Sequence, residues 1–173
     1  AYPGDILGLT NPGVFLLGDT VCLGPPVRFL DIPRFAPEHF GVLRNRRAEK
    51  YKQFQKGLQQ LSEEGVVQLF HEIGAGRTEP ILGVVGQLQF EVIQFRLQSE
   101  YGVETILDPT PYRLARWVEG TPEAIRGVYW ASATRRVEDD RGNLVCLFES
   151  EWGLEYTQEN APGIRFRDTA PDG

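Results

Sequence analysis

Residues that commonly catalyse reactions or bind metal ions are few in this sequence and lie far apart. The two cysteines, Cys22 and Cys146, form no CxxC pair, so their spacing indicates neither a zinc site nor an iron–sulfur site. The two histidines, His39 and His71, belong to no HExxH motif and to no recognisable catalytic triad. We therefore expect two ordinary buried thiols and two histidines in surface or helix-capping positions.

The glycines and paired carboxylates do not form a catalytic or phosphate-binding motif either. No GxxxxGK[ST] sequence occurs, so this chain lacks the loop that holds nucleotide phosphates. The GVVGQL segment with Gly83 and Gly86 lacks GxGxxG spacing and predicts a tight strand-to-helix turn. The carboxylate pairs at 63–64 and 139–140 fit solvated positions at a helix end and in a polar loop. We expect no catalytic residue, metal site or cofactor in this chain.

One segment could bind an anionic partner through its charge. The formal net charge is −6, but residues 1–57 carry eight Lys/Arg against five Asp/Glu, which gives +3; residues 58–173 carry ten against nineteen, which gives −9. Between residues 44 and 56 a single anion, Glu49, stands among the cations. A phosphate backbone is a natural partner for such a cluster, and an ordinary solvated helix face is the alternative. The candidate RNA-contacting residues are Arg44, Arg46, Arg47, Lys50, Lys52 and Lys56.

The basic segment leads into the first of two predicted amphipathic helices, over about residues 46–64. Its apolar positions are spaced three, four and three apart, which places them on one helical face, and Gly65 stands where a helix C-terminus prefers glycine. The residues of this face are Tyr51, Phe54, Leu58 and Leu61.

The second predicted helix covers residues 87–101 and ends at Gly102. We expect both helices to bury their apolar stripes against one shared antiparallel sheet. The stripe of the second helix consists of Phe90, Ile93, Leu97 and Tyr101, and is widened by Leu88, Val92 and Phe95.

The segments around these helices predict the strands that they cover. Residues 27–32, 66–70, 81–85 and 103–107 have strand-like apolar runs, and IPRFAPEHF is expected to be a proline-broken connection. The resulting order is β-α-β-β-α-β, the split βαβ order of a ferredoxin-like sandwich of the α+β class. This domain is expected to span residues 26–109.

Residues 1–25 and 110–173 predict two further units. The first contains short apolar runs at 6–9, 14–17 and 21–23, which we interpret as the last strands of a truncated β-barrel. The second is predicted to be a small α/β lobe. Its expected elements are strands at 112–118, 144–148 and 164–166, a helix capped by Thr121 that runs to about Trp130, and a helix capped by Ser150 that runs to about Asn160.

Composition predicts a folded, soluble chain. Hydrophobic residues make up 41% of the sequence and aromatic residues 11%, which is enough apolar surface to offset the conformational entropy of the chain. No signal-peptide pattern or membrane-spanning apolar run is found, so we expect a cytoplasmic protein without a membrane partner. Because the sequence has no methionine, we also expect it to be a piece of a longer protein.

Several strings of residues resemble one family of bacterial translational GTPases. PGDILGL followed by GDT is similar to the closing strands of the barrel domain of the peptide chain release factor 3 family. IPRFAPEHF, KGLQQLSEEGVVQLF, GVVGQLQFEVIQFRLQSEYGVE and RWVEG are similar to its third domain. The resemblance covers most of the chain and is weakest across about 120–143. Elongation factor G opens its corresponding second helix with Gly-Glu-Leu-His, from which the segment 87–90 departs.

The resemblance implies a function for the whole protein. A family member would bind GTP or GDP with magnesium through an upstream domain, dock on the ribosome and promote dissociation of class-one release factors after translation termination. The third domain would face RNA and protein of the small ribosomal subunit and transmit the state of its own GTPase domain. No catalytic residue of the family is carried over to a position in this chain.

Three other functions are compatible with the predicted fold. The chain could be the C-terminal domain of another translational GTPase similar to elongation factor G. A ferredoxin-like sheet can also form a dimeric regulatory domain for small molecules, or host an acyl or phosphoryl hydrolase. The hydrolase would need an anion-binding loop with an activating residue, which the sequence does not contain.

Overall fold

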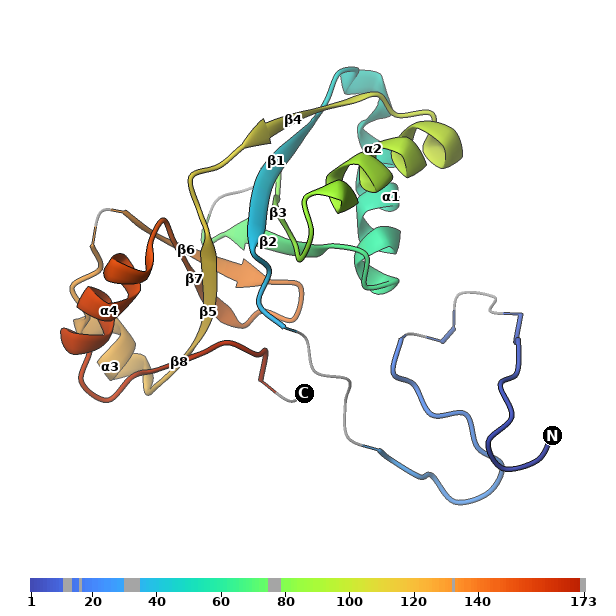
Figure 1. Cartoon of the computed structure of the whole chain (residues 1–173), viewed down its shortest axis with the longest axis horizontal. Coiled ribbons are helices and arrows are strands. Elements are labelled where there is room, and N and C mark those ends of the chain that lie inside the picture. Colours follow the sequence, from blue (N-terminus) through green and yellow to red (C-terminus); the bar gives the residue numbers. More distant parts are fainter. Residues whose placement is uncertain (11–13, 16, 30–34, 75–78, 132, 172–173) are drawn as a thin grey trace.

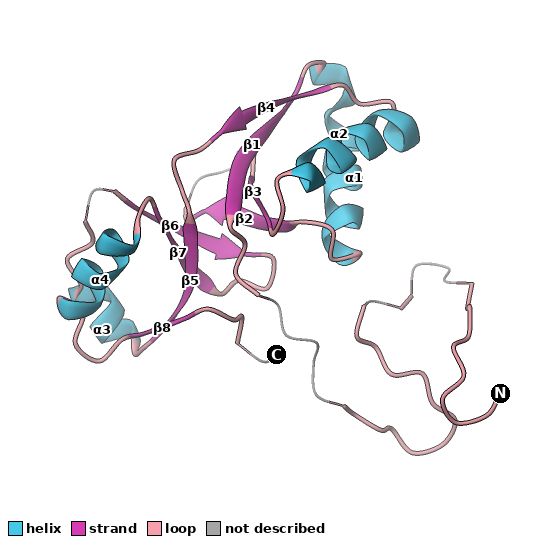
Figure 2. Ribbon diagram, in the orientation of Figure 1, coloured by secondary structure: helices cyan, strands magenta, loops and turns pink. Residues whose placement is uncertain are grey.

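The computed structural model describes residues 1–10, 14–15, 17–29, 35–74, 79–131 and 133–171. These residues form one antiparallel sheet of eight strands in the order β4-β1-β3-β2-β6-β7-β5-β8, with four α-helices (Figures 1 and 2). The predicted α+β class is confirmed. The strands are β1 (His39–Asn45), β2 (Gln68–Glu72), β3 (Ile81–Val84), β4 (Thr105–Pro109), β5 (Leu114–Glu119), β6 (Thr134–Asp139), β7 (Leu144–Phe148) and β8 (Arg165–Arg167). The helices are the short 3-10 helix η1 (Ala48–Lys50), α1 (Tyr51–Glu63), α2 (Leu88–Tyr101), α3 (Pro122–Gly127) and α4 (Glu151–Glu159).

The first half of the sheet has the β-α-β-β-α-β order expected from the sequence. Strand β1 lies between β4 and β3, with Leu43 opposite Leu107 and Phe40 opposite Gly83. Helices α1 and α2 cover one face of this half-sheet (Figure 1). Their apolar stripes enter the same core as Leu43 and Leu82, so the prediction that both helices pack on one shared sheet is confirmed.

The second half of the sheet continues from the first without a break. Phe70 of β2 pairs with Asp139 of β6, which joins the half-sheet β6-β7-β5-β8 to the edge of β2. Helices α3 and α4 lie on one face of this second half (Figure 2). The domain boundaries expected from the sequence stay predictions, but the second α/β region shares its sheet with the first.

The helices and half-sheets form four layers, and a buried apolar cluster lies between each pair of neighbouring layers. One cluster lies between α1, α2 and the first half-sheet, and another lies between α3, α4 and the second half-sheet. Because side chains alternate between the faces of a strand, each half-sheet also has a second apolar face, and these two faces pack on each other. The largest member of this central cluster is Trp117, whose indole Nε1 donates to Asp139 Oδ2 at 2.9 Å.

Local sequence explains where several helices begin and end. The side chain of Thr121 accepts from the Ala124 amide at 3.2 Å, and that of Ser150 accepts from the Gly153 amide at 3.3 Å, as predicted for N-caps. Helix α2 is capped at its C-terminus by Gly102, whose φ of 65° lies in the left-handed region. Helix α3 ends at Gly127, earlier than the predicted end near Trp130.

The prediction for the N-terminal region is corrected by the structure. Residues 6–9 and 21–23 form no strand, and neither do the described residues 27–29; part of 14–17 and residues 30–32 lie outside the described residues. Among the described residues the first strand is instead β1, which begins in the last two residues of the expected connection IPRFAPEHF and continues to Asn45. A short apolar run becomes a strand only when a partner supplies hydrogen bonds, and β3 and β4 supply them to residues 39–45.

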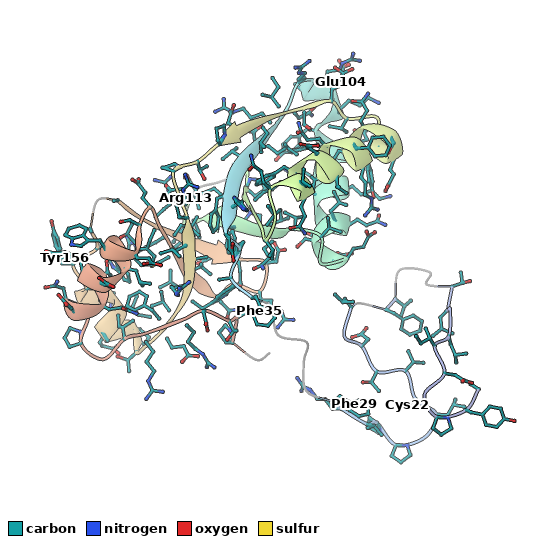
Figure 3. All side chains as sticks on the ribbon, viewed as in Figure 1. Cys22, Phe29, Phe35, Glu104, Arg113 and Tyr156 are labelled. Atoms are coloured by element: carbon teal, nitrogen blue, oxygen red, sulfur yellow. The ribbon has the colours of Figure 1, made fainter. Side chains whose placement is uncertain are left out.

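Two expectations about buried side chains are also wrong. Leu88 and Phe95 of α2 are 72% and 71% exposed, and Val92 is 49% exposed, because the helix buries only the stripe that faces α1 and the sheet. Cys22 is exposed in the N-terminal segment (Figure 3), whereas Cys146 is buried as expected. Burial raises the pKa of the Cys146 thiol to about 12.

Candidate functional site

The basic segment lies at one corner of the first half-sheet. It runs from the end of β1 through η1 into the first two turns of α1, with the beginning of β4 beside it (Figure 1). Asn45 pairs with Thr105 across β1 and β4, which brings Glu104 next to the chain that carries the cations. Figure 3 shows Glu104 at this end of the molecule.

Two of the six predicted cations are neutralised by carboxylates. Arg44 lies on the sheet face opposite to α1 and forms ion pairs with Asp108 and, at 4.0 Å, with Glu79. Arg47 forms an ion pair with Glu104 at 3.3 Å. These pairs are exposed and add little stability, but each lowers the net positive charge available to an anionic partner.

A third cation, Lys50, lies near the C-terminus of α2, where a positive charge is favourable. It ends η1 and is partly buried, and its ammonium nitrogen lies near Gly102, 3.8 Å from where a Cβ on that glycine would be. The carboxyl end of α2 carries partial negative charge, so a cation at this point is stabilised. Lys50 therefore lies between the beginning of α1 and the end of α2.

The remaining three cations form the exposed part of the segment. Arg46, Lys52 and Lys56 are exposed, and within the described ranges none of them lies within ion-pair distance of a carboxylate. Lys52 and Lys56 are one turn apart on α1 and thus project from neighbouring positions of the same face. We call these three residues the basic corner.

The basic corner borders an open groove of about 460 Å³ between α2 and β4. Arg46 forms one wall, and its backbone amide donates to the Glu104 carbonyl at 3.0 Å. Gln94 donates from its side-chain amide to the Thr105 carbonyl at 3.3 Å and so links the two elements. The sequence did not predict this groove, because its lining comes from segments that only strand pairing brings together. The lining residues are Arg46, Glu91, Gln94, Gln98, Glu104 and Thr105.

A serine, an aspartate and a histidine also meet, but not in an order that supports nucleophilic catalysis. The Ser62 hydroxyl donates to Asp140, and His71 Nε2 lies 3.2 Å from Asp140 Oδ1. The carboxylate lies between the other two groups, so the imidazole is not placed to accept the serine proton. The cluster instead joins α1 and β2 to the turn between β6 and β7, and its hydrogen bond raises the pKa of His71.

Among the described residues there is neither a helix that could cross a membrane nor a group of side chains that could hold a metal ion. None of their helices has the length and apolar character that crossing a membrane requires. No group of three or more His, Cys, Asp or Glu side chains in this part of the chain is placed to hold a metal ion.

Comparison with known proteins identifies the family. The family model described as "Class II release factor RF3, C-terminal domain" matches residues 29–158. Peptide chain release factor 3 of Gloeobacter violaceus is 51% identical over 173 residues, which is 99% of this chain and 32% of that protein. The protein of the same name from Symbiobacterium thermophilum is 51% identical over 170 residues, covering 98% of this chain and 32% of the relative. The chain thus spans about a third of the length of these relatives. It belongs to the release factor 3 family, and the matched region is the family's C-terminal domain.

Proposed function

We propose that this chain is the ribosome-docking module of a translation-termination factor that promotes recycling of class-one release factors. Full-length relatives that share about half of its residues are named peptide chain release factor 3, which supports the role in termination. The observation that carries the docking proposal is the basic corner, an exposed group of cations without acidic partners in the described part of an otherwise acidic chain.

The chemistry of the basic corner suits phosphate groups. Arg46 presents a planar guanidinium, and Lys52 and Lys56 present point charges one helical turn apart. Neutralising phosphates with such side chains releases counterions, so binding weakens as salt concentration rises. The expected partners are ribosomal RNA and protein of the small subunit.

Helix α1, which carries Lys52 and Lys56 of the basic corner, forms a stiff unit with α2, and this supports a role in transmitting orientation. A Cβ on Gly57 of α1 would lie 2.5 Å from Leu97 Cδ2, so the two helices approach closely at this point. Tyr101 donates from its hydroxyl to Gln60 at 2.7 Å, and Arg96 pairs with Glu64 of the neighbouring element. A closely packed helix pair moves as one body, so a force on the basic corner reaches the sheet.

In this proposal, nucleotide binding belongs to the part of the full-length protein that lies outside this chain. We expect that part to bind GTP or GDP with magnesium and to act in the cytoplasm, with this chain contacting the GTPase domain. The phosphate-binding loop that such a domain needs does not occur in the sequence of this chain. In this proposal the chain contributes binding and positioning, and no catalytic step.

The proposal is tested by reversing charges in the full-length protein and measuring co-sedimentation with ribosomes over a series of salt concentrations. The variant Lys52→Glu/Lys56→Glu is compared with Arg113→Glu/Arg165→Glu, which reverses two exposed arginines of the second half. Removing each phosphate contact makes the negative slope of log K against log salt shallower by about 0.7–0.9. We expect weaker binding and a shallower slope for the first variant only. Equal binding by both variants would rule out the basic corner as the docking site.

A further inference from the structure

The outer face of α4 carries an unusual pair of exposed aromatic side chains. Trp152 is 69% exposed and Tyr156 is 36% exposed, although both rings are large. Their centroids lie 5.4 Å apart with an interplanar angle of 22°, so they stack on each other. The helix is anchored to the sheet from its other side by Leu154 and Thr157, which are buried. Figure 3 shows Tyr156 on the outer side of α4.

This pair has no packing role that would explain its residue types. The cluster beneath α4 contains Leu154 and Phe148, and neither member of the pair belongs to it. Exposed Trp and Tyr side chains are enriched at the centres of protein–protein interfaces, because they bury a large area and lose little conformational entropy. The stacked pair therefore has the composition of an interface anchor.

The charge around the pair is negative. Each of the four glutamates on and just before α4 is exposed, and none forms an ion pair within the part of the chain that the structure describes. Three of them recur every four residues along α4 and so lie in a row next to the aromatic ridge. Such a face repels phosphate and favours a cationic partner. The residues are Glu149, Glu151, Glu155 and Glu159.

The same half of the molecule already contains an arginine placed on a tryptophan. Arg136 Cζ lies 5.6 Å from the centroid of the Trp130 ring, in the range of a cation–π contact. Among the described residues no guanidinium lies over Trp152 in this way. An indole face beside carboxylates can satisfy both the planar surface and the charge of a guanidinium, whereas an ammonium uses the charge alone.

We propose that the outer face of α4 binds an arginine-containing segment of a protein partner. A guanidinium of the partner stacks on Trp152, and further cations pair with the carboxylates of Glu151 and Glu155. This surface is separate from the basic corner and opposite to it in charge, so it does not depend on the docking proposed above. The two surfaces would let the chain contact a nucleic acid and a basic protein segment at once.

The test measures binding of an Arg-Gly repeat peptide to the chain by isothermal titration calorimetry, beside a Lys-Gly peptide of equal length and charge. Trp152→Ala is compared with Phe95→Ala, which removes an exposed aromatic side chain from α2. Glu155→Gln is compared with Glu63→Gln on α1. We expect saturable binding that prefers the arginine peptide and weakens about 3- to 30-fold in Trp152→Ala. Glu155→Gln should weaken it about threefold, and neither control should change it.

Other outcomes overturn the proposal. The absence of saturable binding does so, and so does equal affinity for both peptides with no effect of Trp152→Ala, which indicates non-specific charge attraction. Tighter binding of a single-stranded RNA oligonucleotide that depends on Trp152 would assign the face to nucleic acid instead. Because Trp152 is exposed, the variants should keep the melting temperature of the parent chain, and Trp152→Phe provides a second variant that retains a ring.

Discussion

The two halves of the molecule share one architecture and differ in how their helices are held. In both halves a pair of helices covers the outer face of a half-sheet, and the inner faces meet at the central cluster. Helices α1 and α2 have 13 and 14 residues and contact each other closely, whereas α3 and α4 have 6 and 9 residues. The first half is thus a stiff helical unit, while the second keeps short helices with exposed side chains on their outer side.

Because of this difference, each half can change in some places without disturbing the other. Two of the three residues of the basic corner lie on α1, a long helix that packs tightly against α2, and the aromatic pair of α4 lies on a helix held by few buried side chains. Both halves nevertheless depend on the central cluster between them, to which each contributes one face of its strands. Substitutions in that cluster should affect both halves, and substitutions between helices should affect one.

The largest effect is expected from Trp117→Ala in the central cluster. Trp117 is 1% exposed, and the substitution removes its ring and leaves Asp139 without the indole donor. We expect the free energy of unfolding to fall by about 3–5 kcal/mol, with both halves unfolding in one transition. Urea denaturation followed by far-UV circular dichroism measures the change. Trp152→Ala is the control and should change stability by less than about 0.5 kcal/mol. Two separate transitions in the parent chain would contradict a shared core.

A smaller effect is expected from Gly57→Val, which tests the contact between α1 and α2. The new Cβ would lie 2.5 Å from Leu97 Cδ2 and 3.0 Å from the Tyr101 ring, so these side chains or the helices that carry them must shift. We expect a loss of about 1–3 kcal/mol of unfolding free energy, measured by thermal and urea denaturation. Gly127→Val at the end of α3 is a matched control, since a Cβ there meets no atom within 4 Å. A similar loss in both variants would mean that the helix contact is not the cause.

The smallest effect concerns His71, which lies where the two halves meet beyond the central cluster. Its hydrogen bond to Asp140 is the main cause of its raised pKa, and the charge of Glu138 adds to it. Because the folded pKa lies above the unfolded value of about 6.5, the stabilisation is complete below that pH and is lost as pH rises through the folded pKa.

The measurement for His71 compares the parent chain with Asp140→Asn at pH 5.5 and pH 8.5. We expect the parent to be more stable by a larger margin at the lower pH, and the nuclear magnetic resonance titration of His71 to move to lower pH in the variant. The effect is modest, since the imidazole is 47% exposed. A difference in stability that is independent of pH would show that the contribution of His71 is not electrostatic.

The sequence by itself determined the elements whose signals are local. The stripes of Phe54, Leu58 and Leu61 and of Phe90, Ile93 and Leu97 are buried as their spacing predicts, because helical periodicity depends only on neighbouring residues. The caps at Thr121 and Ser150 form for the same reason. The basic segment and the resemblance to release factor 3 were also visible in the sequence.

Which segments pair with each other depends on tertiary contacts, which local sequence patterns do not specify. The choice of residues 39–45 as the first strand, the pairing of β2 with β6 and the exposure of Phe95 depend on surfaces supplied by distant parts of the chain. The same holds for the candidate site, where pairing of β4 with β1 places Asp108 of β4 and Glu104, just before β4, next to two of the six predicted cations, which they neutralise. Charge in the sequence is additive, but the charge that a partner meets depends on which residues folding brings side by side.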